Sequence, residues 1–337
     1  MSHQIQIANS DATFICNDEQ SLLDAGLKAG IEMPYSCRKG VCGNCAGKIV
    51  QGEVTGIKGA AIRNEMCTPE QVLFCMCTAT SGLLIEPQSW QRIDPNARKR
   101  ITAKVFRNQL VAPDVSLLQL RLPPGQRAKF KAGQYMQVQL EDGSTRSYSM
   151  ANPPQESDAI TLHIRHVPGG RFTAVAPTLK TGDLLDIEVP FGSFSLQEQT
   201  TRPIVCVVGG TGFAPIKSIL DDMVKRRIHR PVTLIWGARN ADGLYLLSAV
   251  ERWQRQLPGF RFVPALSEDF VSTLEGIYAG PVHEAMLAHC DTLIDHELYC
   301  CGSPGMVAAV REAAVNQRGL AVADFHSDVF VEGGAAS

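Results

Sequence analysis

The feature of this 337-residue chain with the clearest chemistry is a set of cysteines with a fixed spacing. Four and then two residues separate the first three thiols, and the fourth comes from a distant segment: Cys37, Cys42, Cys45 and Cys75. This is the plant-type spacing for a [2Fe–2S] cluster. Gly40 and Gly43 would let the loop backbone approach the cluster, because glycine has no Cβ. We therefore predict a [2Fe–2S] cluster on these four thiolates.

Two other interpretations of the cysteines stay open at this stage. Four thiolates also form tetrahedral zinc sites, and cysteines can simply be buried free thiols. Zinc motifs commonly have two Cys-x-x-Cys pairs, whereas only Cys42 and Cys45 form one here. Of the 11 cysteines, most precede residue 80, a bias that metal binding explains better than disulfides in so long a chain.

A second candidate site follows the Asp142-Gly143 turn signal and comprises Arg146, Ser147, Tyr148 and Ser149. An arginine fork can neutralise a pyrophosphate, a tyrosine ring can stack on a planar cofactor, and a serine hydroxyl can reach that cofactor's reactive nitrogen. The order Arg-x-Tyr-Ser resembles the signature of the ferredoxin-reductase flavin domain. We predict that Tyr148 and Ser149 lie at the reacting ring of a flavin.

A glycine loop supports this prediction: Gly169, Gly170, Arg171, Phe172 and Thr173. We expect it to open a helix, whose backbone N–H groups and Thr173 hydroxyl would bind the pyrophosphate. An ordinary strand-to-helix turn is the alternative.

Two further glycine loops predict a dinucleotide site. Gly209, Gly210, Thr211 and Gly212 follow an apolar run at 204–208 and precede a helical pattern, so they would cradle a phosphate at the carboxyl end of a parallel strand. The segment 300–306 repeats this arrangement with Cys301, Gly302 and Ser303. A tight structural turn is the alternative for the first loop, and a buried thiol is the alternative for Cys301 beside a nicotinamide.

The N-terminal elements that would position the cysteines form a small domain. We expect strands at 3–8, 12–17 and 48–50, and a helix that begins at Ser21, with Asp24 three residues later as in a capping box, and ends at Gly30. Residues 1–92 are therefore predicted to form a β-grasp ferredoxin domain. The polar stretch 93–100, broken by Pro95, is predicted to be a linker.

The rest of the chain changes character near residue 200. Short alternating stretches such as 160–167, separated by turn signals, predict a small antiparallel β-barrel over 101–200, the stretch that contains the flavin motif. Over 201–337, apolar strands alternate with helical patterns, which predicts a parallel α/β sheet that carries the two dinucleotide loops. The fold class is thus multi-domain, α+β followed by α/β.

Composition excludes some partners. Lys and Arg total 32 against 34 Asp and Glu, and a net charge of −2 gives no signature of nucleic-acid or anionic-membrane binding. The N-terminus shows no signal-peptide pattern and no apolar run reaches the length of a membrane span. We expect a cytoplasmic protein.

The order of ferredoxin, flavin and nicotinamide domains resembles the reductase components of multicomponent oxygenases over nearly the whole chain. Four segments are most like the reductases of aromatic-ring, terephthalate-type dioxygenases: 36–40, 146–154, 163–171 and 300–304. The resemblance implies electron transfer from NAD(P)H through FAD and the [2Fe–2S] cluster to a terminal oxygenase. That order also follows from chemistry, because nicotinamide delivers two electrons as hydride while the cluster accepts one at a time.

The same resemblance assigns site residues. It implies FAD contacts from Arg146, Tyr148, Ser149, His163, Ile164, Arg165, His166, Gly170, Arg171, Phe172 and Thr173. It implies nicotinamide contacts from Gly210, Thr211, Gly212, Arg239, Cys301, Gly302 and Ser303. The closing segment 325–330 is similar to the family's, where an aromatic lies near the flavin, so Phe330 is a candidate for that role, with a core aromatic as the alternative.

The sequence says less about which nicotinamide dinucleotide is used and which protein receives the electrons. Arg239 ends the second predicted strand of the α/β domain, where a 2′-phosphate would lie, and this favours NADPH over NADH. A reductase for a CDP-deoxysugar dehydrase has the same domain order and is one alternative. A non-enzymatic electron carrier or redox sensor with a degenerate flavin domain is another.

Overall fold

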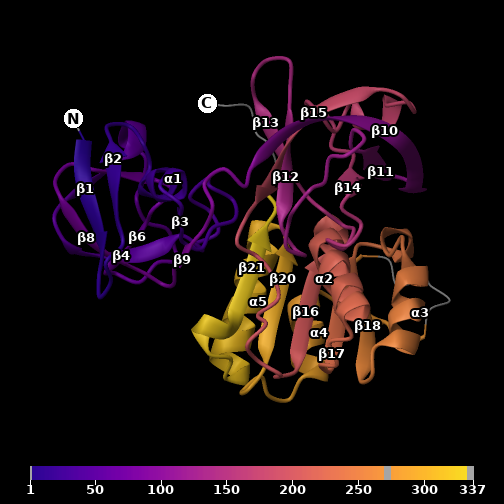
Figure 1. The fold of residues 1–337 in the computed structure, drawn as a ribbon. Coiled ribbons are helices and arrows are strands. Elements are labelled where there is room, and N and C mark those ends of the chain that lie inside the picture. The colour runs from indigo at the N-terminus through magenta and orange to yellow at the C-terminus, as the bar shows by residue number, and fades with distance from the viewer. Residues whose placement is uncertain (1, 269–274, 332–337) are drawn as a thin grey trace. The chain divides into compact units, whose positions relative to one another are not determined.

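The computed structural model describes residues 2–268 and 275–331, and the chain divides into two compact units (Figure 1). The first unit comprises Met1–Arg98 and the short segment Gly192–Phe194, and the second comprises Lys99–Phe191 and Ser195–Ser337. The short segment belongs to the first unit because Gly192 N donates to the Tyr35 hydroxyl at 2.8 Å and Ser193 Oγ donates to Tyr35 O at 3.1 Å.

The first unit is built on a mixed sheet with strand order β2-β1-β8-β4-β6, in which only β1 and β8 are parallel. Two small antiparallel pairs, β3 with β9 and β5 with β7, complete it. Its elements are β1 (Ser2–Ile7), β2 (Thr13–Asn17), α1 (Leu22–Lys28), β3 (Ile31–Glu32), β4 (Ala46–Gln51), β5 (Val54–Gly56), η1 (Ile57–Gly59), β6 (Gln71–Leu73), β7 (Cys77–Ala79), β8 (Leu83–Pro87) and β9 (Gln91–Arg92).

Local sequence explains the start of α1. Ser21 is the N-cap, and its Oγ accepts a hydrogen bond from Asp24 N at 3.0 Å, which satisfies one of the free N–H groups of the first turn. The predicted cap is confirmed. The helix ends at Lys28, and Gly30 follows with a φ of 78°.

The first half of the second unit is a six-stranded antiparallel sheet in the order β13-β12-β15-β10-β11-β14. The antiparallel prediction is confirmed, but a closed barrel is not: among the described residues a single bridge, Met150 with Leu162, joins the two end strands. The elements are β10 (Lys99–Ala112), β11 (Val115–Arg121), β12 (Tyr135–Gln139), β13 (Thr145–Ser149), β14 (Ala159–Arg165), η2 (Ala176–Thr178) and β15 (Leu184–Phe191).

Two local expectations need comment. The helix expected after Gly170 is wrong, because residues 171–175 form turns followed by the short 3₁₀ segment η2. Pro177 within this short segment lacks a backbone N–H, so it cannot contribute to a longer helical ladder. Within the stretch predicted as a linker, Lys99 and Arg100 already pair with β15 as part of β10. The predicted domain boundaries themselves stay predictions.

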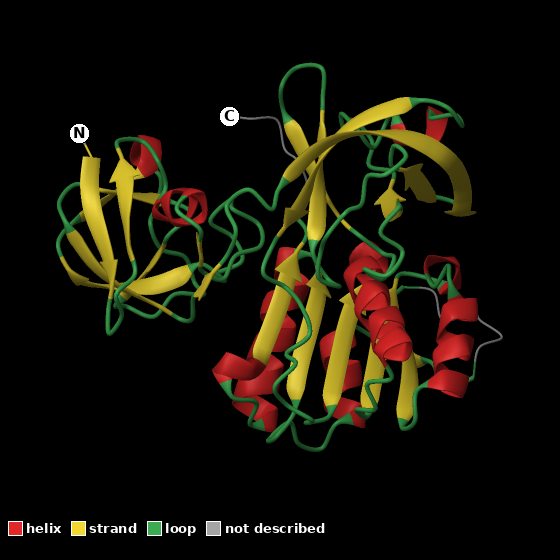
Figure 2. Ribbon diagram, in the orientation of Figure 1, coloured by secondary structure: helices red, strands yellow, loops and turns green. Residues whose placement is uncertain are grey.

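The second half of this unit is a parallel sheet in the order β19-β18-β17-β16-β20-β21, with helices on both faces (Figure 2). The predicted parallel α/β arrangement is confirmed. Its elements are β16 (Ile204–Gly209), η3 (Gly210–Gly212), α2 (Phe213–Arg226), β17 (Val232–Ala238), η4 (Ala241–Gly243), α3 (Leu247–Gln256), β18 (Phe260–Leu266), β19 (Tyr278–Ala279), α4 (Val282–His289), β20 (Glu297–Gly302), α5 (Pro304–Glu312), the π-helical turn η5 (Ala313–Gln317), η6 (Val322–Asp324) and β21 (Phe325–Val329).

Within residues 2–268 and 275–331, no helix is both long enough and apolar enough to cross a bilayer.

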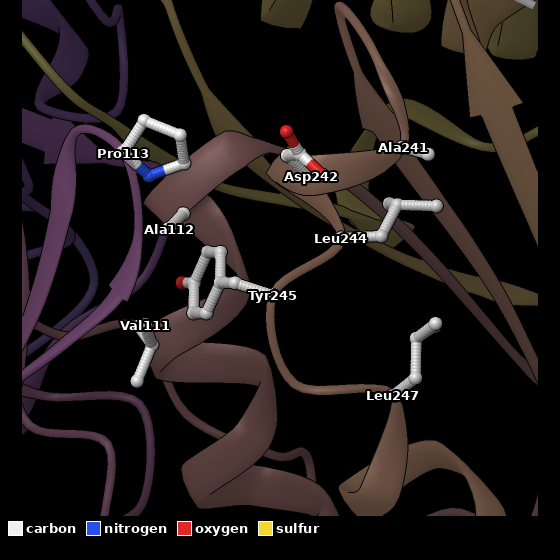
Figure 3. A pocket seen from close by; sticks show the side chains of 8 residues that line it. All are labelled: Val111, Ala112, Pro113, Ala241, Asp242, Leu244, Tyr245 and Leu247. Atoms are coloured by element: carbon white, nitrogen blue, oxygen red, sulfur yellow. The ribbon is translucent and has the colours of Figure 1, made fainter. Parts of the chain in front are cut away.

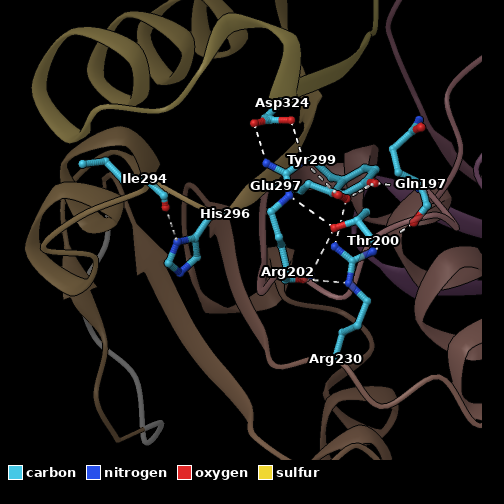
Figure 4. A network of polar contacts seen from close by, with 9 residues as sticks. All are labelled: Gln197, Thr200, Arg202, Arg230, Ile294, His296, Glu297, Tyr299 and Asp324. Carbon is cyan, nitrogen blue, oxygen red and sulfur yellow. Dashed lines mark hydrogen bonds and ion pairs between the residues drawn. The ribbon is translucent and has the colours of Figure 1, made fainter.

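A buried carboxylate holds the amino-terminal edge of this parallel sheet (Figure 4). Glu297, at the start of β20, has no exposed surface, and its two oxygens lie 2.9 Å from Arg230 Nη2 and 3.3 Å from Arg202 Nη2. The Tyr299 hydroxyl donates to the same carboxylate at 2.9 Å, and Arg202 also pairs with Asp324 at 2.6 Å. A buried charge needs such partners, so this network stabilises the edge opposite to the strand ends that carry the candidate site.

We expect Glu297→Gln to lower the free energy of unfolding of this unit by about 3–5 kcal/mol, because it leaves the buried Arg230 charge uncompensated. Urea unfolding followed by the fluorescence of Trp236 and Trp253, both fully buried, measures the change.

The matched control is Glu198→Gln, which breaks an exposed pair with Arg226 and should cost less than about 1 kcal/mol. Equal losses in the two variants would contradict the assigned role of the Glu297 network.

Candidate functional site

The four predicted cluster cysteines lie in the first unit, on the loop between β3 and β4 and directly after β6. Their thiols associate in two hydrogen-bonded pairs, Cys37 with Cys42 and Cys45 with Cys75. The two pairs also influence each other electrostatically, because Cys42 acts on Cys45 and Cys37 acts on Cys75. The structure therefore brings all four predicted ligands into one locality.

One thiol of each pair has a pKa below its ordinary value. The hydrogen bond from Cys42, together with N–H groups of Lys39 and Cys42 at 3.4 Å, lowers the pKa of Cys37 to about 5. The hydrogen bond from Cys45 likewise lowers the pKa of Cys75, and the donors Cys42 and Cys45 have raised pKa values. Low-pKa thiolates are the form that binds metal.

The arrangement of the thiols in two pairs helps to distinguish a [2Fe–2S] cluster from a zinc ion as the group that they would bind. Two adjacent pairs of thiols, each with backbone N–H donors nearby, fit two irons with two thiolates each. The donor set thus fits a [2Fe–2S] cluster better than a tetrahedral zinc ion.

Glycines let the cluster loop close. Gly40 and Gly43 have φ of 74° and 75°, a region that favours glycine. A Cβ on Gly43 would lie 2.5 Å from Met66 Cβ, and one on Gly40 would lie 2.9 Å from Met76 Cγ. Larger residues at these positions would push the loop away from its neighbours.

The predicted flavin motif lies on β13, an end strand of the antiparallel sheet, and directly precedes Met150, which forms the bridge to Leu162. Tyr148 packs against Phe172 with ring centroids 5.3 Å apart, and burial raises the pKa of its hydroxyl while Arg146 lowers it. Arg146 Nη1 donates to Thr145 O at 2.8 Å. The Arg146 and Tyr148 side chains are thus close together, as the motif requires, and Ser147 lies between them with its side chain on the exposed face.

Strand β14 contributes the second predicted set. His163 is buried, and burial, with a smaller effect of Lys217, lowers its pKa to about 3, so its ring is neutral. Its Nδ1 lies 2.9 Å from the Tyr245 hydroxyl, but its buried Nε2 has no hydrogen-bond partner. An orphaned buried polar atom marks a place where a bound group is expected, which fits a cofactor beside β14.

The residues that follow His163, at the end of β14 and just after it, have different surroundings. Arg165 Nη1 pairs with Asp114 at 2.7 Å, and a Cβ on Gly210 would lie 2.7 Å from Arg165 Nη2. His166 Nε2 lies 2.8 Å from Ser116 Oγ. Ile164 belongs to the apolar core of the antiparallel sheet. Arg165 therefore lies beside the first nucleotide loop, while Ile164 is a packing residue.

The glycine loop 169–173 folds tightly on itself. A Cβ on Gly170 would lie 2.0 Å from Thr173 Oγ1, and that hydroxyl donates to Val167 O at 3.1 Å. Arg171 pairs with the carboxylate of Asp142, and Phe172 is buried beside Tyr148. The loop is thus connected to the β12–β13 turn that precedes the flavin motif.

The two predicted nucleotide loops touch each other through their backbones. A Cβ on Gly212 would lie 2.2 Å from the Cys301 carbonyl oxygen. Gly209 ends β16, Gly210 and Thr211 form the 3₁₀ turn η3, and α2 begins at Phe213. The first loop is therefore a strand–turn–helix unit at the carboxyl end of β16, where parallel sheets bind ligands.

The second loop follows β20. Cys301 is fully buried, and burial with the nearby Asp328 raises its pKa. Gly302 lies against Met306, and Ser303 caps α5 by accepting a hydrogen bond from Met306 N at 3.4 Å. Phe330 N donates to Gly302 O at 2.8 Å, so the half-buried Phe330 lies beside this loop.

Asp328 is a site residue that the sequence analysis did not single out. Ser149 Oγ donates to Asp328 Oδ2 at 3.1 Å, and both side chains are buried. In the parallel ladder Asp328 is level with Cys301. This hydrogen bond joins the flavin motif to the end of the parallel sheet. A carboxylate within the last strand, β21, was the available signal.

A cavity of about 490 Å³ lies beyond the end of β17 (Figure 3). It is lined by Val111, Ala112, Pro113, Ala241, Asp242, Leu244, Tyr245 and Leu247. Arg239 follows β17 directly, is largely exposed, and its Nε lies 3.6 Å from Glu268 Oε1. The acidic Glu268 beside Arg239 was not anticipated from the sequence.

Known proteins share the whole architecture. Three family models match: the 2Fe-2S iron-sulfur cluster binding domain over residues 5–80, the oxidoreductase FAD-binding domain over 102–196, and the oxidoreductase NAD-binding domain over 206–312. Reductase component 1 of terephthalate 1,2-dioxygenase from Comamonas sp is 57% identical over 330 residues, which covers 98% of each chain.

More distant relatives have other tasks. CDP-6-deoxy-L-threo-D-glycero-4-hexulose-3-dehydrase reductase from Yersinia pseudotuberculosis is 34% identical over 98% of this chain and 99% of its own. Among solved structures, the ferredoxin reductase in carbazole 1,9a-dioxygenase superposes with a TM-score of 0.71 at 27% identity, covering 98% of this chain and 99% of its own.

We expect Gly212→Ala to destabilise the second unit by about 1–3 kcal/mol, because its Cβ would meet a backbone oxygen that cannot rotate away. Thermal unfolding monitored by tryptophan fluorescence measures the change.

Gly305→Ala is the matched control, since an added Cβ there has no neighbour within 4 Å and the residue lies in α5. A Gly212→Ala variant as stable as this control would show that the two loops are not in tight contact.

Proposed function

Because this chain belongs to the family of oxygenase reductase components that join a [2Fe–2S] domain to FAD-binding and NAD-binding domains, we propose that it is the reductase of a terephthalate-type aromatic-ring dioxygenase. It would take electrons from a nicotinamide dinucleotide and deliver them singly to a terminal oxygenase. When bound, FAD supplies the conversion from hydride transfer to single-electron transfer that a [2Fe–2S] cluster requires.

The Ser149–Asp328 hydrogen bond is the observation that carries this proposal. Hydride transfer needs the flavin and nicotinamide rings in contact, so the two binding motifs must meet. Ser149 comes from the flavin motif, while Asp328 is level with Cys301 in the nicotinamide half. We infer that Tyr148, Ser149, Cys301 and Phe330 surround the reacting rings.

The cofactor contacts follow from the same geometry. Arg146 and Arg165 offer guanidinium groups for the FAD pyrophosphate, and the orphaned Nε2 of His163 offers a neutral polar contact. Gly209–Gly212 and Cys301–Ser303 would hold the nicotinamide dinucleotide across the carboxyl ends of β16 and β20. The four cysteines would hold the cluster. Asp328 would orient Ser149 through their hydrogen bond.

A cytoplasmic location is part of the proposal. None of the 11 cysteines, all of which lie in the described residues, forms a disulfide, which is typical of proteins kept in a reducing compartment.

Two other assignments have less support. The CDP-deoxysugar dehydrase reductase from Yersinia pseudotuberculosis is 34% identical, against 57% for the terephthalate 1,2-dioxygenase reductase component, so it is the weaker match. A carrier or sensor without flavin chemistry would not need the buried Ser149–Asp328 contact.

The decisive experiment mixes the purified protein anaerobically with NADPH or NADH, and follows flavin bleaching and the electron paramagnetic resonance of the reduced cluster. Reduction of both centres, followed by electron delivery to a terephthalate-type oxygenase, is the expected result. Flavin bleaching without cluster reduction, or no bleaching at all, would contradict the proposal. Delivery only to a CDP-deoxysugar dehydrase would support the second assignment.

We expect Cys45→Ser to abolish the cluster while hydride transfer to the flavin continues, because the cysteines lie in a separate compact unit from the flavin and nicotinamide motifs. Visible absorption reports the cluster, and NAD(P)H oxidation with an artificial acceptor reports the flavin. Cys67→Ser is the control, and should keep both signals. Loss of NAD(P)H oxidation in Cys45→Ser would contradict modular transfer.

NADPH preference is proposed from Arg239. A charge-assisted contact with a 2′-phosphate is worth roughly 1.5–3 kcal/mol, so Arg239→Ala should raise the KM for NADPH about ten- to a hundredfold and leave that for NADH nearly unchanged. Glu268→Gln should lower the KM for NADPH, because Glu268 now competes for Arg239. Equal effects on both nucleotides in steady-state assays would reject the preference.

A further inference from the structure

Both polar atoms of the Asn64 side chain form hydrogen bonds, Nδ2 with the cluster loop and Oδ1 with residues of its own segment. Its Nδ2 donates to the carbonyl oxygens of Gly40 at 2.8 Å and Val41 at 3.0 Å. Its Oδ1 accepts from Met66 N at 2.9 Å and from Cys67 Sγ at 3.5 Å. One amide side chain therefore joins the segment that follows η1 to two successive peptide groups of the cysteine loop.

The two carbonyls it holds determine where two N–H groups point. In a planar trans peptide, the C=O of one residue and the N–H of the next point in opposite directions. Because the carbonyls of Gly40 and Val41 face Asn64, the N–H groups of Val41 and Cys42 face the other way. The Cys42 N–H donates to Cys37 Sγ at 3.4 Å, and the Val41 N–H also acts on this sulfur.

The segment that carries Asn64 is itself fixed. Leu73 N donates to Ile62 O at 2.7 Å, and Arg63 Nε donates to Gln71 O at 2.9 Å, which ties the segment to β6. Met66 fills the space beside Gly43, where an added Cβ would lie 2.5 Å from Met66 Cβ. Asn64 therefore acts from a rigid support.

We propose that Asn64 is a positioning residue that raises the reduction potential of the cluster by aiming two backbone N–H groups at Cys37. The inference rests on the proposed function, since it requires the [2Fe–2S] cluster on Cys37. Hydrogen bonds to the ligand sulfurs help to set the potential of such clusters. They stabilise the reduced cluster more, because it carries one more negative charge. Asn64 would thus tune electron transfer without touching a ligand.

The test measures the midpoint potential of the cluster by redox titration with electron paramagnetic resonance. Asn64→Ala removes both donors without changing charge. We expect about a tenfold drop in the reduced-to-oxidised ratio at a fixed potential, which is ~59 mV for one electron. Asn64→Asp keeps the acceptor oxygen but has no donor, so its potential should fall at least as far.

Glu65→Gln is the matched control for charge. It changes the net charge by one, as Asn64→Asp does but with the opposite sign, at the adjacent exposed residue, and leaves both carbonyl contacts of Asn64 in place. Its potential should stay close to that of the unmodified protein. An unchanged potential in Asn64→Ala, or shifts of equal size in Asn64→Asp and Glu65→Gln, would overturn the proposal.

Two further outcomes distinguish failure of this inference from failure of the proposed function. Absence of any cluster signal in the unmodified protein would reject the proposed function itself. If Asn64 variants lose the cluster, the melting temperature of the metal-free protein decides: an unchanged value supports action at the loop, and a large drop shows a purely structural role and overturns the inference.

Discussion

The register of three parallel strands determines where the chemistry of the second unit can occur. Val208 of β16 is level with Cys301 of β20, and Cys301 is level with Asp328 of β21. Both glycine turns therefore begin at the same height, and Gly212 meets the Cys301 carbonyl because nothing larger than a hydrogen fits between them. A slip of one residue in either ladder would turn Asp328 away from Ser149 and separate the flavin motif from the nucleotide loops.

The two buried acids of this sheet show how position along a strand separates stability from function. Glu297 begins β20, and two arginines and a tyrosine hydroxyl compensate its charge. Asp328 lies near the opposite end of the neighbouring strand, in contact with a serine hydroxyl and beside the Cys301 thiol. Ion pairing stabilises the amino ends of the strands. The polar groups at the carboxyl ends lie where parallel sheets bind ligands.

Local chemistry made part of this structure predictable. The spacing of the cysteines, the Ser21 cap and the alternation of strands and helices each depend on a few neighbouring residues, so the sequence alone could reveal them. The Ser149–Asp328 hydrogen bond joins residues far apart in the chain, so no pattern of neighbouring residues predicts it. The helix expected after Gly170 is wrong, and the closed barrel is not confirmed, because tertiary packing and pairing between distant strands decide both.

The cluster loop shows why a neutral amide suits a place beside several thiolates. An aspartate could accept hydrogen bonds from its own segment but could not donate to the loop carbonyls, and a lysine could donate but not accept. Asparagine does both, so one short side chain holds the loop and its own turn together. Because it carries no net charge, it adds no charge repulsion beside the thiolates, and it can act on Cys37 through the backbone groups that it orients.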